Sequence, residues 1–216
     1  MTRSRFITHI TLKEQVRRLP RVMIGLTIFG IGISLMIVAE LGLGPWDVFH
    51  QGLSELLGLE IGTIIILVGV VLVAVLLALR EPIGLGTIAN MLVIGLVANI
   101  VIDLLEQPDS IALRTMMMLV GPVIVGLGTG IYLGSHSGPG PRDGLMTALS
   151  RRGPKVWQAR TAIEVVVLIA GWLLGGNVGV GTVWFAISVG PFVHFFLHHL
   201  EMDIADEDRL IALDTK

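Results

Sequence analysis

Six long apolar runs constrain this chain more than any other feature. Each is close to the roughly 20 residues that an α-helix needs to cross the ~30 Å hydrocarbon core of a bilayer. Only 15% of the residues are charged, against about 25% in a typical soluble domain. A soluble fold could not cover so much apolar surface, and the alternation expected of a membrane β-barrel is absent. The sequence therefore predicts an all-α polytopic membrane protein with transmembrane helices over 22–41, 61–79, 83–105, 115–135, 156–175 and 178–199.

Basic residues are distributed unevenly around these runs. Six of them lie within the first 21 residues, namely Arg3, Arg5, Lys13, Arg17, Arg18 and Arg21. Because the cytoplasmic loops of membrane proteins collect Lys and Arg, we expect the N-terminus in the cytoplasm. Six crossings then return the C-terminus to the same side. Of the 15 basic residues, only Arg114 lies outside in this topology.

The two ends of the chain differ in charge. Residues 1–20 are expected to form a basic cytoplasmic segment, and 201–216 form an acidic cytoplasmic tail. Within the first segment, residues 6–19 read either as a short interfacial helix after a capping box at Thr11 and Glu14 or as a disordered basic tail.

A shift along the sequence indicates an internal duplication. At an offset of 96 or 95 residues, two motifs of the first half coincide with motifs of the second: Gly44, Pro45 and Asp47 with Gly140, Pro141 and Asp143, and Gly84, Gly86 and Thr87 with Gly179, Gly181 and Thr182. We therefore predict membrane repeats at 21–105 and 116–200, joined by an extracytoplasmic connection at 106–115. Three crossings per repeat is an odd number, so the second repeat should be inverted relative to the first, as in many transporters.

The inversion depends on whether the Gly-Pro-x-Asp segments cross the membrane. Residues 45–59 would form only about 22 Å of helix, and they hold several polar side chains. We expect each repeat to contain a short broken or half helix beginning at Pro45 or Pro141, since proline suits the first helical turn. The alternative is eight full crossings with parallel repeats, which the charge distribution alone does not exclude.

The half helices carry the candidate substrate-binding residues. Asp47 and Asp143 would lie near helix N-termini, where a carboxylate serves either as a cap or as part of a binding site. Trp46 is either an interfacial anchor or a pocket wall. Arg142 could grip a carboxylate or phosphate, or reach toward lipid headgroups. His50 completes the first half helix, and Asn90 on the third long helix joins the same candidate set.

A second set of candidates lies on the fifth long helix. Glu164 and Arg160 are four residues apart and so share a helix face. They are either an internal ion pair that fixes packing or a pair coupled to protons or substrate. Gly126, Gly130 and Gly134 recur every four residues, which is typical of close helix packing between the repeats or in a homodimer.

Motifs of several other protein classes are missing from the sequence. There is no phosphate loop, no HExxH and no Gly-x-Ser-x-Gly, and with no cysteine there is no thiolate metal site. We therefore expect no catalytic residues, no metal site and no cofactor. No feature suggests nucleic-acid binding, so the expected partners are the lipid bilayer, a small-molecule substrate and, as an open alternative, a second copy of the chain.

Three motifs resemble a known family. Gly-Leu-Gly-Pro-Trp-Asp-Val-Phe-His at 42–50, Gly-x-Gly-Thr at 84–87 and 179–182, and Gly-Pro-Arg-Asp-Gly-Leu-Met at 140–146 resemble the YczE-like group of bacterial integral membrane proteins, which is related to the YitT family. The resemblance covers about residues 20–200. It implies a multi-pass protein of the bacterial inner membrane.

The function expected from these features is secondary transport or export of a small metabolite, with the site between two inverted repeats. Two alternatives from other classes stay open. One is a membrane scaffold or assembly partner for a biosynthetic protein. The other is the substrate-binding subunit of an energy-coupled uptake system.

Overall fold

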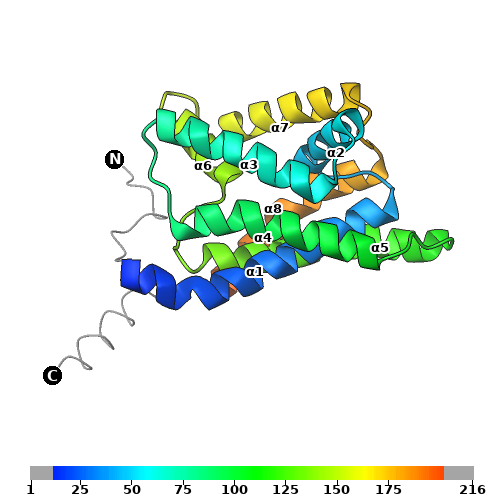
Figure 1. Cartoon of the computed structure of the whole chain (residues 1–216), viewed down its shortest axis with the longest axis horizontal. Helices are drawn as coiled ribbons and strands as arrows, with labels where there is room; N and C mark the ends of the chain where they lie inside the picture. The colour runs from blue at the N-terminus through cyan, green and yellow to red at the C-terminus, as the bar shows by residue number, and fades with distance from the viewer. Residues whose placement is uncertain (1–11, 202–216) are drawn as a thin grey trace.

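The computed structural model describes residues 12–201. This part of the chain consists of α-helices joined by turns and loops and contains no β-strand. Six of its eight helices are long and apolar enough to cross a membrane. The all-α, multi-pass expectation is therefore confirmed (Figure 1). In chain order the helices are α1 (Leu12–Ala39), α2 (Pro45–Leu57), α3 (Ile61–Ala78), α4 (Leu85–Leu104), α5 (Ile111–Leu133), α6 (Pro141–Ser150), α7 (Val156–Leu173) and α8 (Val180–Leu200).

The first helix differs from the sequence-based expectation. Leu12 to Ala39 form one continuous helix with Pro20 inside it. The prediction of a separate interfacial helix over residues 6–19 is therefore wrong for residues 12–19, the part that the structure describes. Thr11, the first half of the expected capping box, lies outside the described residues. A continuous helix keeps the backbone groups that enter the apolar region hydrogen-bonded within the helix. Arg18 is buried and points into the protein.

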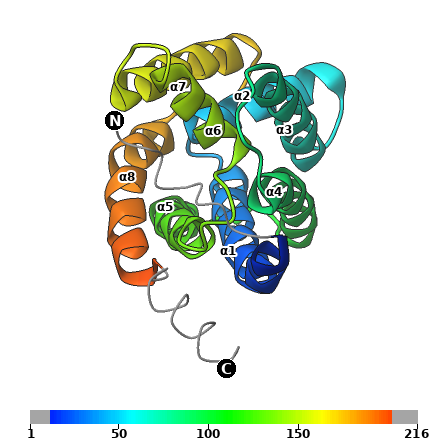
Figure 2. The same ribbon diagram turned by 90° about the vertical axis from the view of Figure 1, so that its left-hand side faces the viewer.

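α1 and α5 form the centre of the molecule and run antiparallel. A Cβ on Gly25 would lie 2.8 Å from the carbonyl oxygen of Gly128, and one on Gly32 would lie 3.0 Å from that of Gly121. These glycines let the two backbones touch, which is how small residues promote helix packing in membranes. In the end-on view α1 and α5 lie side by side, with α4 beside α1 and α8 beside α5 (Figure 2).

The expected glycine stripe on α5 packs elsewhere. Gly126 and Gly130 face Phe192 and Phe196 of α8, and Gly134 faces the end of the same helix. The stripe therefore joins two helices of the second half, and the seam between the halves is formed by other glycines. On α1, Gly30 meets Val97 of α4 in the corresponding way.

The remaining helices form a second layer in which the halves of the chain exchange partners. α2 packs closely on α7, and α6 packs on α3 and α7. Gly171 of α7 lies against the backbone of Val48 and Phe49, while Gly144 of α6 lies against Leu76 of α3. In both interfaces a glycine of the second half allows a residue of the first half to approach closely.

The turns of the two halves match in backbone conformation. The eight described residues with positive φ form four pairs at the offset of the duplication: Glu40 (49°) with His136 (55°), Gly42 (109°) with Gly138 (113°), Gly58 (65°) with Gly153 (138°), and Arg80 (57°) with Gly175 (100°). Positive φ is uncommon outside glycine. The two halves therefore change direction at equivalent points.

We predict that Gly25→Ala destabilises the protein, because its Cβ would lie 2.7 Å from the amide nitrogen of Tyr132. Such overpacking typically costs about 1–3 kcal/mol. Gly190→Ala is the matched control, since nothing lies within 4 Å of a Cβ there and alanine favours helix by up to about 1 kcal/mol. Thermal unfolding in detergent should show a lower Tm for the first variant only. Equal melting of both variants would contradict the crossing described above.

Candidate functional site

The short helices α2 and α6 begin where the sequence predicts. Each has proline at its first position and glycine as N-cap, Gly44 before Pro45 and Gly140 before Pro141. They have 13 and 10 residues, and neither is among the six helices able to span. α2 and α6 lie toward opposite ends of the long helices (Figure 1). Contacts between their first turns, described below, show that their N-terminal ends meet inside the protein.

An equivalent backbone hydrogen bond holds the entry to each short helix. The amide of Gly181, at the start of α8, donates to the carbonyl of Leu41 at 2.7 Å, and the amide of Gly86, at the start of α4, donates to that of Ser137 at 2.9 Å. At Gly42 a Cβ would lie 2.6 Å from the amide nitrogen of Gly179, so only glycine fits. The Gly-x-Gly-Thr motifs therefore position the Gly-Pro-x-Asp motifs of the opposite half.

Arg142 of α6 joins the two first turns. Its Nη2 donates to Nδ1 of His50 at 3.4 Å and lies 3.7 Å from the Asp47 carboxylate, while its guanidinium sits 5.3 Å from the centre of the Trp46 ring. Asp47 and His50 are themselves 3.5 Å apart. The structure thus brings together four of the predicted site residues across more than 90 residues of sequence.

This cluster is buried and incompletely hydrogen-bonded. Asp47 is 4% exposed, His50 is fully buried and Trp46 is 8% exposed, whereas the side chain of Arg142 is 22% exposed. Nε2 of His50 and Nε1 of Trp46 have no hydrogen-bond partner in the described part of the chain. Buried polar groups without partners are rare and costly, which marks this as a place where a ligand or water could bind.

His50 is neutral at pH 7. Burial and the positive charge of Arg142 lower the pKa of its imidazole to about 4, because both disfavour the charged form. Nδ1 lies 3.4 Å from Arg142 and 3.5 Å from the Asp47 carboxylate, so it accepts from the first in one tautomer and donates to the second in the other. In both tautomers Nε2 is left without a partner in the described part of the chain.

Asp143 lies beside this cluster and is held by Tyr132, whose hydroxyl donates to its carboxylate at 3.1 Å. Burial raises the pKa of Asp143, opposed by the charges of Arg160 and Arg142 and by the Tyr132 hydrogen bond. Among the described residues, no backbone N–H donates to the carboxylate of Asp47 or Asp143. Neither carboxylate therefore caps its helix through a backbone hydrogen bond.

Asn90 of α4 is also close to the cluster. It lines a small cavity with His50 and Arg142, closed by apolar residues of α3 and α4. The cavity offers about 10 Å³ to the centre of a water molecule, which is room for about one water. In this conformation the polar site is therefore occluded.

Arg160 and Glu164 pair with each other but do not join the cluster. Nε of Arg160 donates to Glu164 at 2.9 Å, and the two side chains are 48% and 29% exposed. The pair thus lies on an outer face of α7. Only the charge of Arg160 reaches the site, through its effect on Asp143.

Two arginines that sequence reasoning did not select tie the ends of α1 and α5 together. Nη1 of Arg18 donates to the carbonyl of Ser135 at 2.9 Å, and Nε of Arg114 donates to that of Ala39 at 2.7 Å. Both the donors and the acceptors are related by the same 96-residue shift. We call these contacts the Arg18 bracket and the Arg114 bracket; they lie at opposite ends of the α1–α5 pair.

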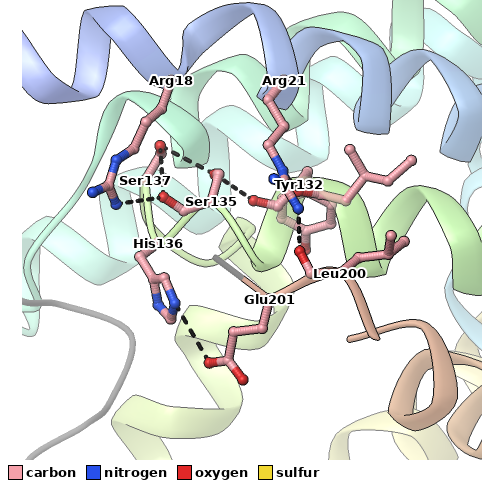
Figure 3. A network of polar contacts seen from close by, with 9 residues as sticks. Arg18, Arg21, Tyr132, Ser135, His136, Ser137, Leu200 and Glu201 are labelled. Carbon is pink, nitrogen blue, oxygen red and sulfur yellow. Dashed lines mark hydrogen bonds and ion pairs between the residues drawn. The ribbon is translucent and has the colours of Figure 1, made fainter. Parts of the chain in front are cut away.

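The Arg18 bracket belongs to a larger network (Figure 3). Arg21 donates to the carbonyl oxygens of Ile131 and Leu200, which links α1 to the ends of α5 and α8. His136 lies 3.4 Å from the carboxylate of Glu201. At the other end, Arg114 also lies 3.9 Å from the Glu40 carboxylate, and Glu40 is the counterpart of His136.

Comparison with known proteins identifies bacterial relatives of this chain. Residues 16–198 match a family described as a family of unknown function, DUF6198. An uncharacterized protein of Haemophilus influenzae is 37% identical over 185 residues, 85% of each chain. The uncharacterized membrane protein YczE of Bacillus subtilis is 33% identical over 188 residues, 86% of this chain and 87% of YczE. The B. subtilis protein YyaS is 30% identical over 198 residues, covering 86% and 95%. No solved structure matches the chain.

We predict that Asp47 and Arg142 are energetically coupled. Removing one partner of a fully buried pair typically costs about 3–5 kcal/mol; because Arg142 is 22% exposed, we expect Asp47→Asn and Arg142→Gln each to lower the Tm by less than that cost implies. The double variant should lose about 1–3 kcal/mol less than the sum of the single losses. The Arg160→Gln and Glu164→Gln cycle is the control, because exposed pairs four residues apart couple by only about 0.3–0.5 kcal/mol. Strict additivity at Asp47 and Arg142 would show that they do not interact.

Proposed function

We propose that this chain, which belongs to the DUF6198 family and is similar to the membrane protein YczE, is a secondary transporter of a small molecule. One observation carries the proposal. Two short helices from equivalent positions of the two halves meet at their N-terminal ends, and they bring Asp47, His50 and Arg142 together in an occluded, incompletely hydrogen-bonded cluster. Broken helices of this kind form the substrate sites of many transporters.

The proposal includes an inverted repeat, which three sets of contacts support. In the antiparallel α1–α5 pair, Gly25 meets Gly128 and Gly32 meets Gly121, and the 96-residue shift exchanges these two contacts. The same exchange relates the two backbone contacts of the Gly-x-Gly-Thr motifs. It also relates the Arg18 and Arg114 brackets. Two equivalent helices that pair antiparallel are what an inverted repeat requires.

We assign the two brackets as gates. Each ties the end of α1 to α5 at one face, so opening one face requires breaking one bracket while the other holds. Equivalent contacts at opposite faces are suited to alternating access around a fixed central site. Near the Arg114 bracket, Glu40, Thr115 and Asn177 line an open pocket of about 420 Å³, which would serve as a vestibule at that face.

The orientation follows from the basic residues. We propose that the Arg18 bracket faces the cytoplasm and the Arg114 bracket faces outward, with both termini inside and the chain in the bacterial inner membrane. The excess of Lys and Arg in the connections on the Arg18 side supports this.

We expect impermeant thiol reagents to report this topology directly, because the chain has no native cysteine. In intact cells, Ser110→Cys and Asn177→Cys should be labelled, and Ser150→Cys should not. In inside-out vesicles the pattern should reverse. Labelling of position 150 from outside intact cells would overturn the proposed orientation.

The gate assignment predicts reciprocal accessibility. Ser137→Cys and Leu41→Cys are matched reporters, since these equivalent residues accept the backbone contacts of Gly86 and Gly181. Combined with Arg18→Ala, labelling should rise at position 137 from the cytoplasmic side and fall at 41 from outside. Arg114→Ala should have the opposite effect. Alternating access requires both changes, because opening one face closes the other.

The same experiment separates gating from local loosening. If each arginine variant raises labelling at its own face and leaves the other face unchanged, the two faces are uncoupled and the transport proposal fails. Melting temperatures of all four double variants identify any that are simply unfolded. The parental reporters, Ser137→Cys and Leu41→Cys with both arginines present, provide the baseline.

A further inference from the structure

A long apolar groove lies directly beside the polar cluster. It has a volume of about 640 Å³ and is formed by α2, α3, α6 and α7. Its inner lining includes Trp46 and Phe49, and its rim includes Val71, Leu149 and Val166. The described side chains that line it are all apolar or aromatic. Pockets of about 300–1,000 Å³ hold drug-sized ligands, so this groove is large enough for the body of a lipophilic molecule.

The groove opens sideways. Val71 is 62% exposed and Val166 is 65% exposed, and α3 and α7, which carry them, do not pack closely on each other. In a bilayer this opening faces hydrocarbon chains. A molecule dissolved in the membrane could therefore enter the groove between α3 and α7 without passing through water.

One layer of side chains separates the groove from the polar cavity. Val68 and Leu72 line both spaces, and Trp46 lines the groove while its ring lies against Arg142. Moving these side chains would join the two spaces and bring the end of a ligand in the groove to His50 and Arg142.

The polar end suits an anion. Arg142 makes only the long contacts described above, both through Nη2, and in the described chain neither its Nε nor its Nη1 donates a hydrogen bond. A guanidinium presents a planar fork with either Nε and Nη2 or Nη1 and Nη2, so a carboxylate that binds both prongs would replace the long contact between Nη2 and Asp47. Nε2 of His50 is also without a partner in the described chain, and in the tautomer in which Nδ1 accepts from Arg142 it offers one more donor.

We infer that the ligand of this site is a single-chain amphiphile with a carboxylate head, which binds Arg142 and His50 while its apolar chain occupies the groove. The inference deepens the proposed function by naming the substrate class, and it rests on that proposal for the direction of movement. Binding itself can be tested without transport.

The test uses Trp46 as a reporter of groove occupancy. In a variant with Phe at Trp157, Trp172 and Trp184, the remaining tryptophan should be quenched by 9,10-dibromostearate added to phosphatidylcholine vesicles. Quenching should saturate and be reversed by oleate. Val71→Phe should raise the half-saturating concentration at least about threefold. Val70→Phe, at a neighbouring exposed valine that does not line the groove, should leave it unchanged.

The role of the carboxylate head group is tested by comparing dibromostearate with the uncharged alcohol of the same chain. Arg142→Gln should weaken binding of dibromostearate at least about tenfold, as expected for loss of a charge-assisted contact, and should leave dibromostearyl alcohol unaffected. Arg142→Lys should lose less than Arg142→Gln. Equal losses for acid and alcohol would overturn the assignment of the carboxylate to Arg142.

Three outcomes would overturn the inference as a whole: quenching that does not saturate, quenching equal to that by brominated phosphatidylcholine at the same bromine content, or equal effects of Val70→Phe and Val71→Phe. The first two would mean that bulk lipid alone fills the groove. None of these outcomes affects the reciprocal labelling experiment on the gates, so the proposal of transport would remain, with a different substrate. Saturable, Val71-dependent binding with uncoupled gates would support the ligand class and remove transport.

Discussion

The antiparallel contact of α1 and α5 is the interaction on which the other parts of the structure depend. Gly25, Gly32, Gly121 and Gly128 bring the two backbones together, and this crossing fixes where both helices end. Each end is tied by an arginine of the other helix, so the loops that follow start from defined positions. Those loops carry the short helices into the protein. The polar cluster is thus set by the packing of residues that have no side chains.

The site itself is energetically expensive. Desolvating Asp47 and Arg142 costs free energy that their long mutual contact recovers only in part, and Nε2 of His50 is buried without a hydrogen-bond partner among the described residues. Packing alone would be served better by apolar residues. That two halves of one chain converge on such a cluster, with equivalent proline-initiated helices, is the reason to regard it as functional and not as part of the packing.

The sequence predicts the helices and the starts of α2 and α6 well, because apolar length and Gly-Pro pairs are local signals. It also indicates which residues are candidates, and Asp47, His50, Asn90 and Arg142 do lie together. It does not reveal that Arg160 and Glu164 face outward. A four-residue spacing shows that two side chains share a helix face, but it does not show whether that face points to the interior or to the outside. Arg18 could have been found: extending the 96-residue shift seven positions before Gly25 pairs it with Arg114.

The close contacts of Gly171 and Gly144 have a consequence for how such a chain can change. Gly171 lies against the backbone of Val48 and Phe49, and Gly144 lies against the side chain of Leu76; the duplication relates Val48 to Gly144 and Leu76 to Gly171. In an assembly of two first halves, Leu76 would take the place of Gly171, where even a Cβ would lie 2.5 Å from the backbone of Phe49. Two copies of the first half would therefore not fit together as the two different halves do.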